Sequence, residues 1–356
     1  MSNSDFLEID GGMGEGGGSV LRLGAAFSFL FKQPIKIKNI RVNRPKPGLR
    51  TQHLLGLKTL SELTSSKLSK CMVGTKELTF IPNTKIKDKI QVNIDTAASL
   101  GLLLQPIQIS SLGFNKLDNI FISLNGGGTF GKWAPSLNYL QEVTYKIFEK
   151  MGLKIEIEIQ KHGFYPKGGA KVKCVINPPK GKIKPLNLIE LGNLDIINGE
   201  IIVTNQLKKN NISERIKNSI EHHLRKSLKI ETDIKYTFVH SDSPGVGLSL
   251  WAHSDTKAII STGTILGEKK ITSEQLGIIA ANEILKYLKN DIPVDNYLSD
   301  QLIPLMAYCN ELSRIKVLEI TNHTRTNLEL IKLFSARKYK IFKKKNYFLI
   351  EFQEKD

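Results

Sequence analysis

The glycine-rich stretch IDGGMGEGGGSVLRL places the carboxylate of Glu15 among six glycines. Glycines let a backbone approach phosphate groups closely, and the helix expected after them would add the positive end of its dipole. A carboxylate in such a loop indicates a divalent cation between protein and phosphate. The stretch has neither the GK[ST] ending of a P-loop nor the Rossmann spacing. Taken alone, it is equally consistent with a structural turn.

A second stretch, IRVNRPKPGLRTQHL, carries four cations within ten residues: Arg41, Arg44, Lys46 and Arg50. Its prolines and glycine predict a loop of defined shape rather than a flexible basic tail. Guanidinium groups on such a loop suit a triphosphate or an RNA phosphate. Arg22, in the helix expected to precede the loop, could join them. The alternative interpretation is a solvated basic loop.

A histidine, His323, lies among small polar residues in EITNHTRTN. The preceding run, RIKVLEI, alternates as a strand does. The histidine is therefore expected where that strand ends. A solvated side chain in a surface turn is the ordinary interpretation of such a residue.

The elements that must position these motifs alternate between helices and strands. Helices are expected at 20–31, 51–63 with Thr51 as N-cap, 96–109 and 136–152, and strands at 34–42, 154–160 and 170–176. The last helix should end at Gly152, and the last two strands flank the loop KHGFYPKGG. This alternation predicts an α/β protein built from repeated units.

A change in composition follows INPPKGKIKP, after which the chain is rich in Asn, Lys and Ile and carries the basic helix SERIKNSIEHHLRKSLK. The chain returns to motif-rich sequence near residue 290. We therefore predict one domain made of residues 1–185 and 290–356, and a second domain, 186–289, inserted into it.

The composition favours a polyanionic partner, because 51 Lys and Arg against 34 Asp and Glu give a net charge of +17. Nucleic acid and an acidic membrane face are both polyanionic. No apolar stretch has membrane-spanning length, and MSNSDFLEID lacks the pattern of a signal peptide. These features predict a soluble, cytoplasmic protein without a membrane partner. Three widely spaced cysteines indicate free thiols rather than a metal site or a disulfide framework.

Taken together, five motifs in this order resemble the RNA 3′-terminal phosphate cyclases: EGGGSVLR, IRVNRPKPGLRTQHL, HGFYPKGG, YLSDQL and a histidine before xxTN. The resemblance runs from about Ile9 to the C-terminus and is weak only in the inserted region. It implies a large domain of repeated βα units with a smaller α/β domain inserted late in the chain. It also implies a ligase that converts an RNA 3′-phosphate end to a 2′,3′-cyclic phosphate, using ATP and Mg²⁺ or Mn²⁺.

The resemblance makes His323 the nucleophile that becomes adenylylated. A neutral imidazole is a good nucleophile, and with an ordinary pKa near 6.5 it is mostly neutral at pH 7. It would attack the α-phosphorus of ATP and expel pyrophosphate. AMP would pass to the RNA 3′-phosphate, giving RNA-pp-A, and the neighbouring 2′-OH would displace AMP.

The same resemblance implies further site residues. Glu15 matches the metal ligand, and Tyr297 could stack on the adenine. The positions that match phosphate contacts are Arg22, Arg41, Arg44, Gln52 and His53; those that match the adenylate pocket are Gln105, Tyr297, Asp300 and Gln301. Without the resemblance, the YLSDQ positions would be interpreted as plain helix surface.

The sequence departs from the family pattern at Phe130, where Asp is common, at Ser136 in place of Pro and at Ala170 in place of a third glycine, and DTAASLGLLLQ lacks the glycine usual before the helix. These departures predict a changed pocket shape near these positions and put the metal environment there in question. They leave Glu15 and His323 untouched.

Other classes of protein remain alternatives. Some relatives of the cyclases lack the histidine and act as non-catalytic RNA-processing or ribosome-assembly factors; here the histidine and the EGGG loop favour the enzyme. A basic RNA-binding module would interleave aromatics with its cations, and aromatics make up only 7% of this chain. An enolpyruvyl transferase would share a related architecture but does not suit a charge of +17. The sequence leaves the oligomeric state and the cellular RNA open.

Overall fold

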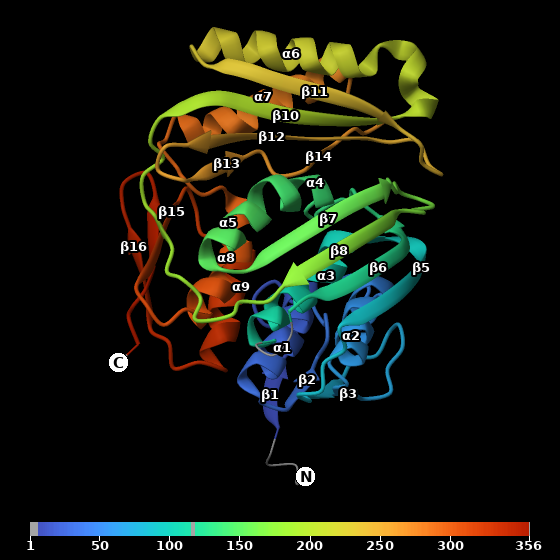
Figure 1. Ribbon diagram of the computed structural model, residues 1–356, viewed down its shortest axis with the longest axis vertical. Coiled ribbons are helices and arrows are strands. Elements are labelled where there is room, and N and C mark those ends of the chain that lie inside the picture. The colour runs from blue at the N-terminus through green and yellow to red at the C-terminus, as the bar shows by residue number, and fades with distance from the viewer. Residues whose placement is uncertain (1–5, 115–117, 356) are drawn as a thin grey trace.

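The computed structural model describes residues 6–114 and 118–355 (Figure 1). The first five residues, part of the stretch assessed above for a signal peptide, lie outside the described residues. Across the described ranges, no helix is both long enough and apolar enough to cross a bilayer. The three cysteines are free thiols, as the sequence predicts.

Three four-stranded sheets share one strand order, in which the first strand of a unit pairs with the second, the second with the fourth and the fourth with the third. In each sheet the first pair is parallel and the others are antiparallel. The strands are β1 (Leu7–Asp10), β2 (Ile35–Lys38), β3 (Lys67–Leu68) and β4 (Leu78–Ile81); β5 (Lys89–Ser99), β6 (Ile120–Gly128), β7 (Lys154–Lys161) and β8 (Lys171–Asn177); and β9 (Asn187–Leu188), β15 (Ser313–Val317), β16 (Tyr339–Lys343) and β17 (Phe348–Phe352). This recurrence confirms the predicted repeated α/β units.

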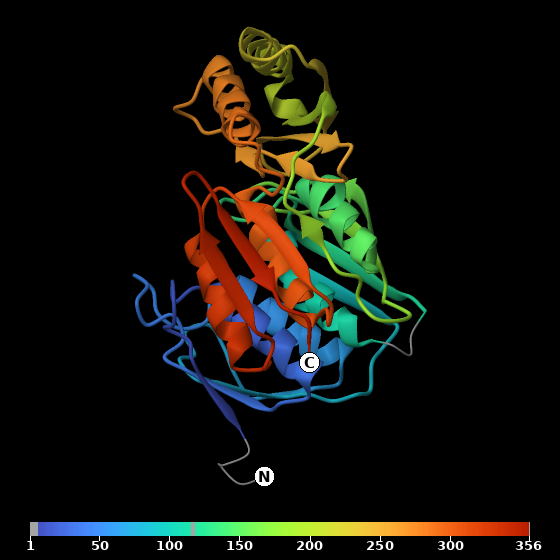
Figure 2. The ribbon, with the colours of Figure 1, turned by 90° about the vertical axis from the view of Figure 1, so that its left-hand side faces the viewer.

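The helices of the three units pack against one another, with the sheets outside them (Figure 2). Helix α1 contacts α2, α3 and α9, and α8 contacts α9. Eleven residues of α1 are buried, so its small and apolar residues lie at the centre of the core. The helices are α1 (Gly18–Phe31), α2 (Thr51–Leu63), α3 (Leu100–Ser110), α4 (Leu137–Tyr139), α5 (Tyr145–Met151), α8 (Asn296–Tyr308) and α9 (Asn322–Lys332), with a π-helical turn, Leu140–Thr144, between α4 and α5.

The third unit carries an insertion between β9 and α8. It forms a five-stranded mixed sheet of order β11-β10-β12-β13, with β14 paired to β12. Helices α6 and α7 pack on each other and on this sheet, and the assembly stands above the three units in Figures 1 and 2. Its elements are β10 (Leu194–Thr204), α6 (Ile212–Ser227), β11 (Glu231–Val239), β12 (Val246–Ser254), β13 (Ile259–Ser261), β14 (Ile265–Leu266) and α7 (Ser273–Leu288). The domain boundaries at 186 and 289 stay a prediction.

Several predicted elements need their ends corrected. The strand expected at 34–42 ends at Lys38. Residues 96–99, expected to begin a helix, instead end β5; α3 starts at Leu100 because the Ser99 hydroxyl accepts the Leu102 N–H at 3.3 Å. The N-cap of α2 is Arg50, whose backbone is extended, and not Thr51. Gly152 ends α5 in the left-handed conformation, as predicted.

Candidate active site

The glycine loop between β1 and α1 lies against α9. Gly14 and Gly16 have φ values of +58° and +56°, a conformation that strongly favours glycine. A Cβ at Gly14 would lie 2.1 Å from the hydroxyl oxygen of Thr326, so the loop backbone and α9 touch there. The Glu15 N–H donates to the same hydroxyl at 3.4 Å. Glu15 is thereby held beside the start of α9.

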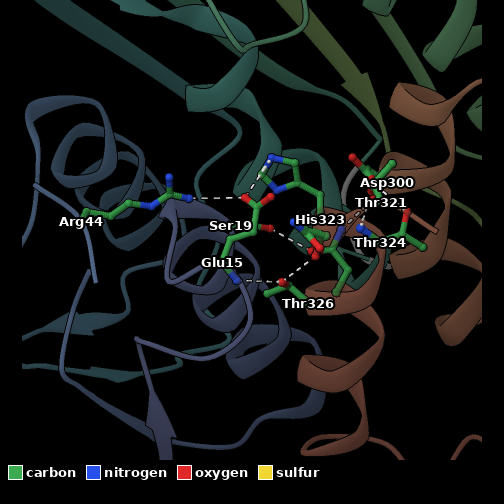
Figure 3. A network of polar contacts seen from close by, with 10 residues as sticks. Glu15, Ser19, Arg44, Asp300, Thr321, His323, Thr324 and Thr326 are labelled. Carbon is green, nitrogen blue, oxygen red and sulfur yellow. Dashed lines mark hydrogen bonds and ion pairs between the residues drawn. The ribbon is translucent and has the colours of Figure 1, made fainter. Parts of the chain in front are cut away.

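The Glu15 carboxylate lies between a guanidinium and an imidazole (Figure 3). Its Oε2 is 3.4 Å from Arg44 Nη2 and 3.3 Å from His323 Nε2. The His323 side chain is 51% exposed, so its ring remains accessible to a reactant. Three segments far apart in the sequence thus meet at one carboxylate, and all three residues were named from the sequence.

The expectation that His323 directly follows a strand is wrong. Strand β15 ends at Val317, and His323 lies in the first turn of α9. Thr321 caps that helix, because its hydroxyl accepts the Thr324 N–H at 2.9 Å. The small polar residues around the histidine are therefore a helix start, which directs N–H groups and a positive dipole end toward the site.

Asp300, on α8, holds the start of α9 in place (Figure 3). Its Oδ1 accepts from the Thr321 hydroxyl at 2.7 Å and from the Thr324 hydroxyl at 2.5 Å. Burial raises the pKa of this carboxyl to about 6, against the opposing effect of the two hydroxyl donors. The structure gives Asp300 a positioning contact to the helix of His323; its direct contact with a nucleotide stays a prediction.

A further link ties α1 to the same helices. The Ser19 hydroxyl donates to Asn327 Oδ1 at 2.8 Å, and Asn327 Nδ2 donates to the backbone oxygen of Asp300 at 3.0 Å. Sequence reasoning missed the supporting residues Ser19, Thr321, Thr324, Thr326 and Asn327. A threonine followed by the helically spaced apolar residues of LELIKL was the signal that could have placed the N-cap.

Arg22 and His53 form a buried pair of phosphate-site candidates. Arg22 Nε donates to Gln105 Oε1 at 2.7 Å, which joins two residues that were predicted separately. Burial, and secondarily Arg41, lowers the pKa of Arg22 to about 10, so it stays protonated at neutral pH. A Cβ at Gly18 would lie 2.2 Å from His53 Nε2 and 2.5 Å from Arg22 Nη1. The glycine loop thus also presses against this pair.

His53 is a neutral hydrogen-bonding group. Its Nδ1 accepts the backbone N–H of Arg50 at 3.4 Å, which leaves the proton on Nε2. Burial mainly, followed by the charges of Arg22, Arg41 and Arg50, lowers the pKa of His53 to about 3. It can donate a hydrogen bond from Nε2 but carries no charge at neutral pH.

The arrangement suits a ligand with several negative charges. Helices α1, α2 and α9 begin here, and none has an acidic residue in its first turn. Their N-termini attract anions. Within the described residues, the Nε atoms of Arg41 and Arg44 are buried without a hydrogen-bond partner. The Glu15 carboxylate lies at this cationic surface, 3.4 Å from Arg44 Nη2.

The remaining predicted residues are less closely connected. Gln301 accepts from Gln108 at 3.3 Å within the core. Tyr297 is 47% exposed and its ring packs over Gly263, where a Cβ would lie 2.4 Å from the ring. Gln52 is half-buried in the first turn of α2. In the part of the chain that the structure describes, none of these three side chains hydrogen-bonds to Glu15 or His323, and their roles stay predictions.

The departures from the family pattern are structural in this chain. Phe130 is buried and stacks on Phe164 with ring centroids 5.2 Å apart; both pack against Ile202 of β10. Ser136 caps α4 by accepting the Tyr139 N–H at 3.1 Å. Ala170 is fully buried. Phe130 therefore joins the second repeat to the inserted sheet and has no polar role.

The residues fit a divalent ion that is shared with nucleotide phosphates. Within residues 6–114 and 118–355, no group of three or more His, Cys, Asp or Glu side chains is arranged to hold a metal. Glu15 offers one half-buried carboxylate beside a cationic surface. Mg²⁺ is commonly held by one or two carboxylates together with substrate phosphates and water, and this donor set is compatible with that mode.

Comparisons with known proteins point to the same family as the sequence motifs. The family model described as "RNA 3′-terminal phosphate cyclase" matches residues 13–341. Proteins with that name are similar along nearly their whole length. That of Thermococcus gammatolerans is 36% identical over 95% of this chain and 94% of its own. That of Pyrococcus furiosus is 37% identical over 94% and 95%, and that of Methanosarcina barkeri 34% identical over 96% and 98%. The chain belongs to the RNA 3′-terminal phosphate cyclase family.

Proposed function

We propose that this protein is an ATP-dependent RNA 3′-terminal phosphate cyclase that works through a covalent His323–AMP intermediate. The observation that carries the proposal is the meeting of an accessible imidazole, His323, with the Glu15 carboxylate at 3.3 Å, where three helix N-termini and several arginines converge. Such a site combines a nucleophile with groups that stabilise phosphate charge. Family membership supports the same activity.

In the first step, a ring nitrogen of His323 attacks the α-phosphorus of ATP. A P–N bond forms, the bond from the α-phosphorus to the bridging oxygen breaks, and pyrophosphate leaves with the electron pair. Arg44 and the buried Arg22 stabilise the charge on the phosphates, and neutral His53 can donate a hydrogen bond to them. A bound divalent ion would neutralise charge on the leaving pyrophosphate, with Glu15 as its protein ligand.

In the second step, an oxygen of the RNA 3′-phosphate displaces the imidazole and takes the AMP, which gives RNA-pp-A. The 2′-OH of the terminal ribose then attacks the activated phosphorus, AMP departs, and the 2′,3′-cyclic phosphate results. The attacking oxygen and the phosphorus belong to the same nucleotide, so proximity supplies much of the rate of ring closure. Asp300, Thr321 and Thr324 keep the helix start that carries His323 in one position.

The main alternative is a non-catalytic RNA-processing or ribosome-assembly role. The accessible His323 and its contact with Glu15 favour the enzyme, because a purely binding protein has no need of a nucleophile held at a helix start. The partner we propose is RNA with a 3′-phosphate end, and the compartment the cytoplasm. The net charge of +17 is consistent with an RNA partner.

The chemistry of the RNA end tests this proposal. A 3′-phosphate RNA incubated with ATP and Mg²⁺ or Mn²⁺ should yield a cyclic end. An otherwise identical RNA whose terminal ribose is 2′-deoxy should accept AMP and stop at RNA-pp-A, because it lacks the attacking hydroxyl. A 3′-OH end should be inert. Cyclic product from the 2′-deoxy end, or efficient use of the 3′-OH end, would rule the cyclase proposal out.

A further inference from the structure

Two loops beside the candidate active site expose large aromatic side chains. Trp133 is 90% exposed and Tyr165 80%, more than any other large hydrophobic residue in the described chain. Trp133 also has a φ of +59°, a conformation that is unfavourable for a bulky residue. The Trp133 ring is not packed in a core that would compensate for its exposure and its strained backbone. Strained conformations tend to persist where they serve a function.

The two loops, residues 129–136 and 162–170, form one rigid unit that we call the loop pair. The backbone N–H of Thr129 donates to the Gly163 oxygen at 2.9 Å, and the Thr129 hydroxyl lies 3.0 Å from His162 Nδ1. The stacked rings of Phe130 and Phe164 lie beneath. Trp133 and Tyr165 are therefore presented on neighbouring turns of a fixed support.

The inserted sheet braces the loop pair. The Ser136 N–H donates to the Thr264 hydroxyl at 2.7 Å, and the Lys167 N–H donates to the Ser243 hydroxyl at 3.0 Å. Two ion pairs add to this junction, Lys132 with Glu268 at 2.8 Å and Lys161 with Asp242 at 2.7 Å. The insertion thus fixes the aromatic side chains relative to the repeated units.

The loop pair adjoins the predicted nucleotide site. A Cβ at Gly131 would lie 3.3 Å from the Cβ of Ser99, and one at Gly101 would lie 2.5 Å from the Pro135 oxygen, so the first loop rests on the start of α3. Gln105, which accepts from Arg22, lies on this helix six residues after its N-cap, Ser99. At the rise of an α-helix this is about 9 Å. An RNA strand bound beside Gln105 is therefore within a few nucleotides of the loop pair.

We propose that Trp133 and Tyr165 are a stacking platform for the bases of single-stranded RNA just upstream of its reacting 3′ end. The inference rests on the proposed function and adds a binding surface to it. Exposed aromatic rings bind unpaired bases whatever their sequence, and cations beside them hold the phosphates. Lys132 Nζ lies 5.2 Å from the Trp133 ring centre and pairs with Glu268. Exposed Lys167 forms no ion pair with any described residue, and its charge helps to lower the pKa of Asp242. The lysines beside the two rings favour RNA as the occupant, because a second copy of this chain would carry the same net positive charge.

Fluorescence of Trp133 tests the platform directly. The chain has two tryptophans, so Trp251→Phe leaves Trp133 as the only one. This variant is titrated with a short 3′-phosphate RNA in the absence of ATP, while anisotropy of a labelled RNA reports binding. Stacking should quench Trp133 as the RNA saturates. An RNA with abasic sites at the second to fourth positions from its end should bind more weakly, by about 5- to 150-fold for each base that loses its stacking, since each stacked base contributes about 1–3 kcal/mol.

Matched variants complete the test. Trp133→Ala and Tyr165→Ala should weaken RNA binding to a similar degree. Phe121→Ala, which removes an exposed aromatic at the far end of β6, about 25 Å along the strand, should not. Binding without quenching, no binding, or indifference to abasic sites overturns the platform. So does a change of oligomeric mass in Trp133→Ala with RNA affinity unchanged, because the rings would then contact a second copy. Attachment of AMP to His323 from ATP alone reports separately on the proposed function.

Discussion

At the scale of single residues, the site depends on one carboxylate facing several cations. Glu15 is 3.4 Å from Arg44 and 3.3 Å from His323, while Arg22 and Arg41 form no ion pair with a carboxylate in the described part of the chain. This balance leaves the surface open to a polyanion, and in the proposed mechanism Glu15 would be the protein ligand of a divalent ion. The same carboxylate, 3.3 Å from His323 Nε2, can keep the imidazole oriented in the absence of a ligand.

Replacing Glu15 tests this balance. Glu15→Gln should slow the attachment of AMP to the protein by about 100-fold, because charge on the leaving pyrophosphate loses its stabilisation. The free energy of unfolding should change by less than about 1 kcal/mol, since Gln keeps the size of the side chain and the lost partners, Arg44 and His323, are themselves partly exposed. Labelled ATP and denaturant titration measure the two quantities. Glu62→Gln, at an exposed ion pair with Lys87, is the matched control and should label normally. A normal rate in Glu15→Gln would remove Glu15 from the site.

His53 predicts a pH dependence of stability. Its pKa is lowered to about 3 in the folded protein, against about 6.5 unfolded, so the folded state binds fewer protons between these values. The stability associated with neutral His53 is complete above pH 6.5 and is lost as the pH falls toward 3. The slope reaches at most about 1.4 kcal/mol per pH unit. Urea unfolding at pH 7, 6 and 5 should give a shallower fall for His53→Gln than for the wild type; parallel curves would contradict the assignment.

At the scale of elements, the start of α9 is the feature that sequence reasoning placed least well. The alternation in RIKVLEI and the apolar spacing in segments such as 51–63 are sufficient to predict that most elements exist. The cap of α9 depends on Thr321, Thr324 and Asp300, and Asp300 lies on another helix. A contact between residues more than twenty positions apart leaves no local periodic signal. The family motifs predict the residues of the site, whereas the residues that hold them in place are identified only from the fold.

The helix cap is therefore expected to matter more for activity than for stability. Thr321→Ala should cost about 1 kcal/mol of stability, as the loss of an N-cap does, and should also slow attachment of AMP because the first turn that carries His323 loosens. Thr272→Ala removes the equivalent cap of α7, where the Thr272 hydroxyl accepts the Gln275 N–H at 3.2 Å. It should lose similar stability and retain labelling. Equal rates in the two variants would show that the cap does not position the histidine.

At the scale of the whole molecule, the site exists only when all three repeated units are assembled. The first unit contributes the glycine loop and the arginines, the second contributes Gln105 through its bond to Arg22, and the third contributes His323. The insertion interrupts the third unit and contacts the loops of the second. The chain carries a net charge of +17, which favours polyanionic partners.

Salt dependence should separate specific from general contacts with RNA. The logarithm of the affinity for a single strand should fall with the logarithm of the salt concentration, with a slope of about −0.7 per phosphate contact, and the affinity should depend little on sequence.

The variant Arg44→Ala should weaken end binding by roughly 2–4 kcal/mol if Arg44 holds a phosphate in the site. Lys46→Ala, an exposed residue of the same loop, should cost well under 1 kcal/mol. Equal losses in the two variants would make Arg44 an ordinary surface charge.

The most direct test of the central claim is transfer of label from α-labelled ATP to the protein in the absence of RNA. The wild type with Mg²⁺ or Mn²⁺ should retain label through denaturing electrophoresis. The bond should survive alkali and break in acid or hydroxylamine, as a phosphoramidate does, and peptide mapping should locate it at His323. His323→Asn should retain no label. Normal labelling of His323→Asn would contradict the account, because the nucleophile would then be another residue.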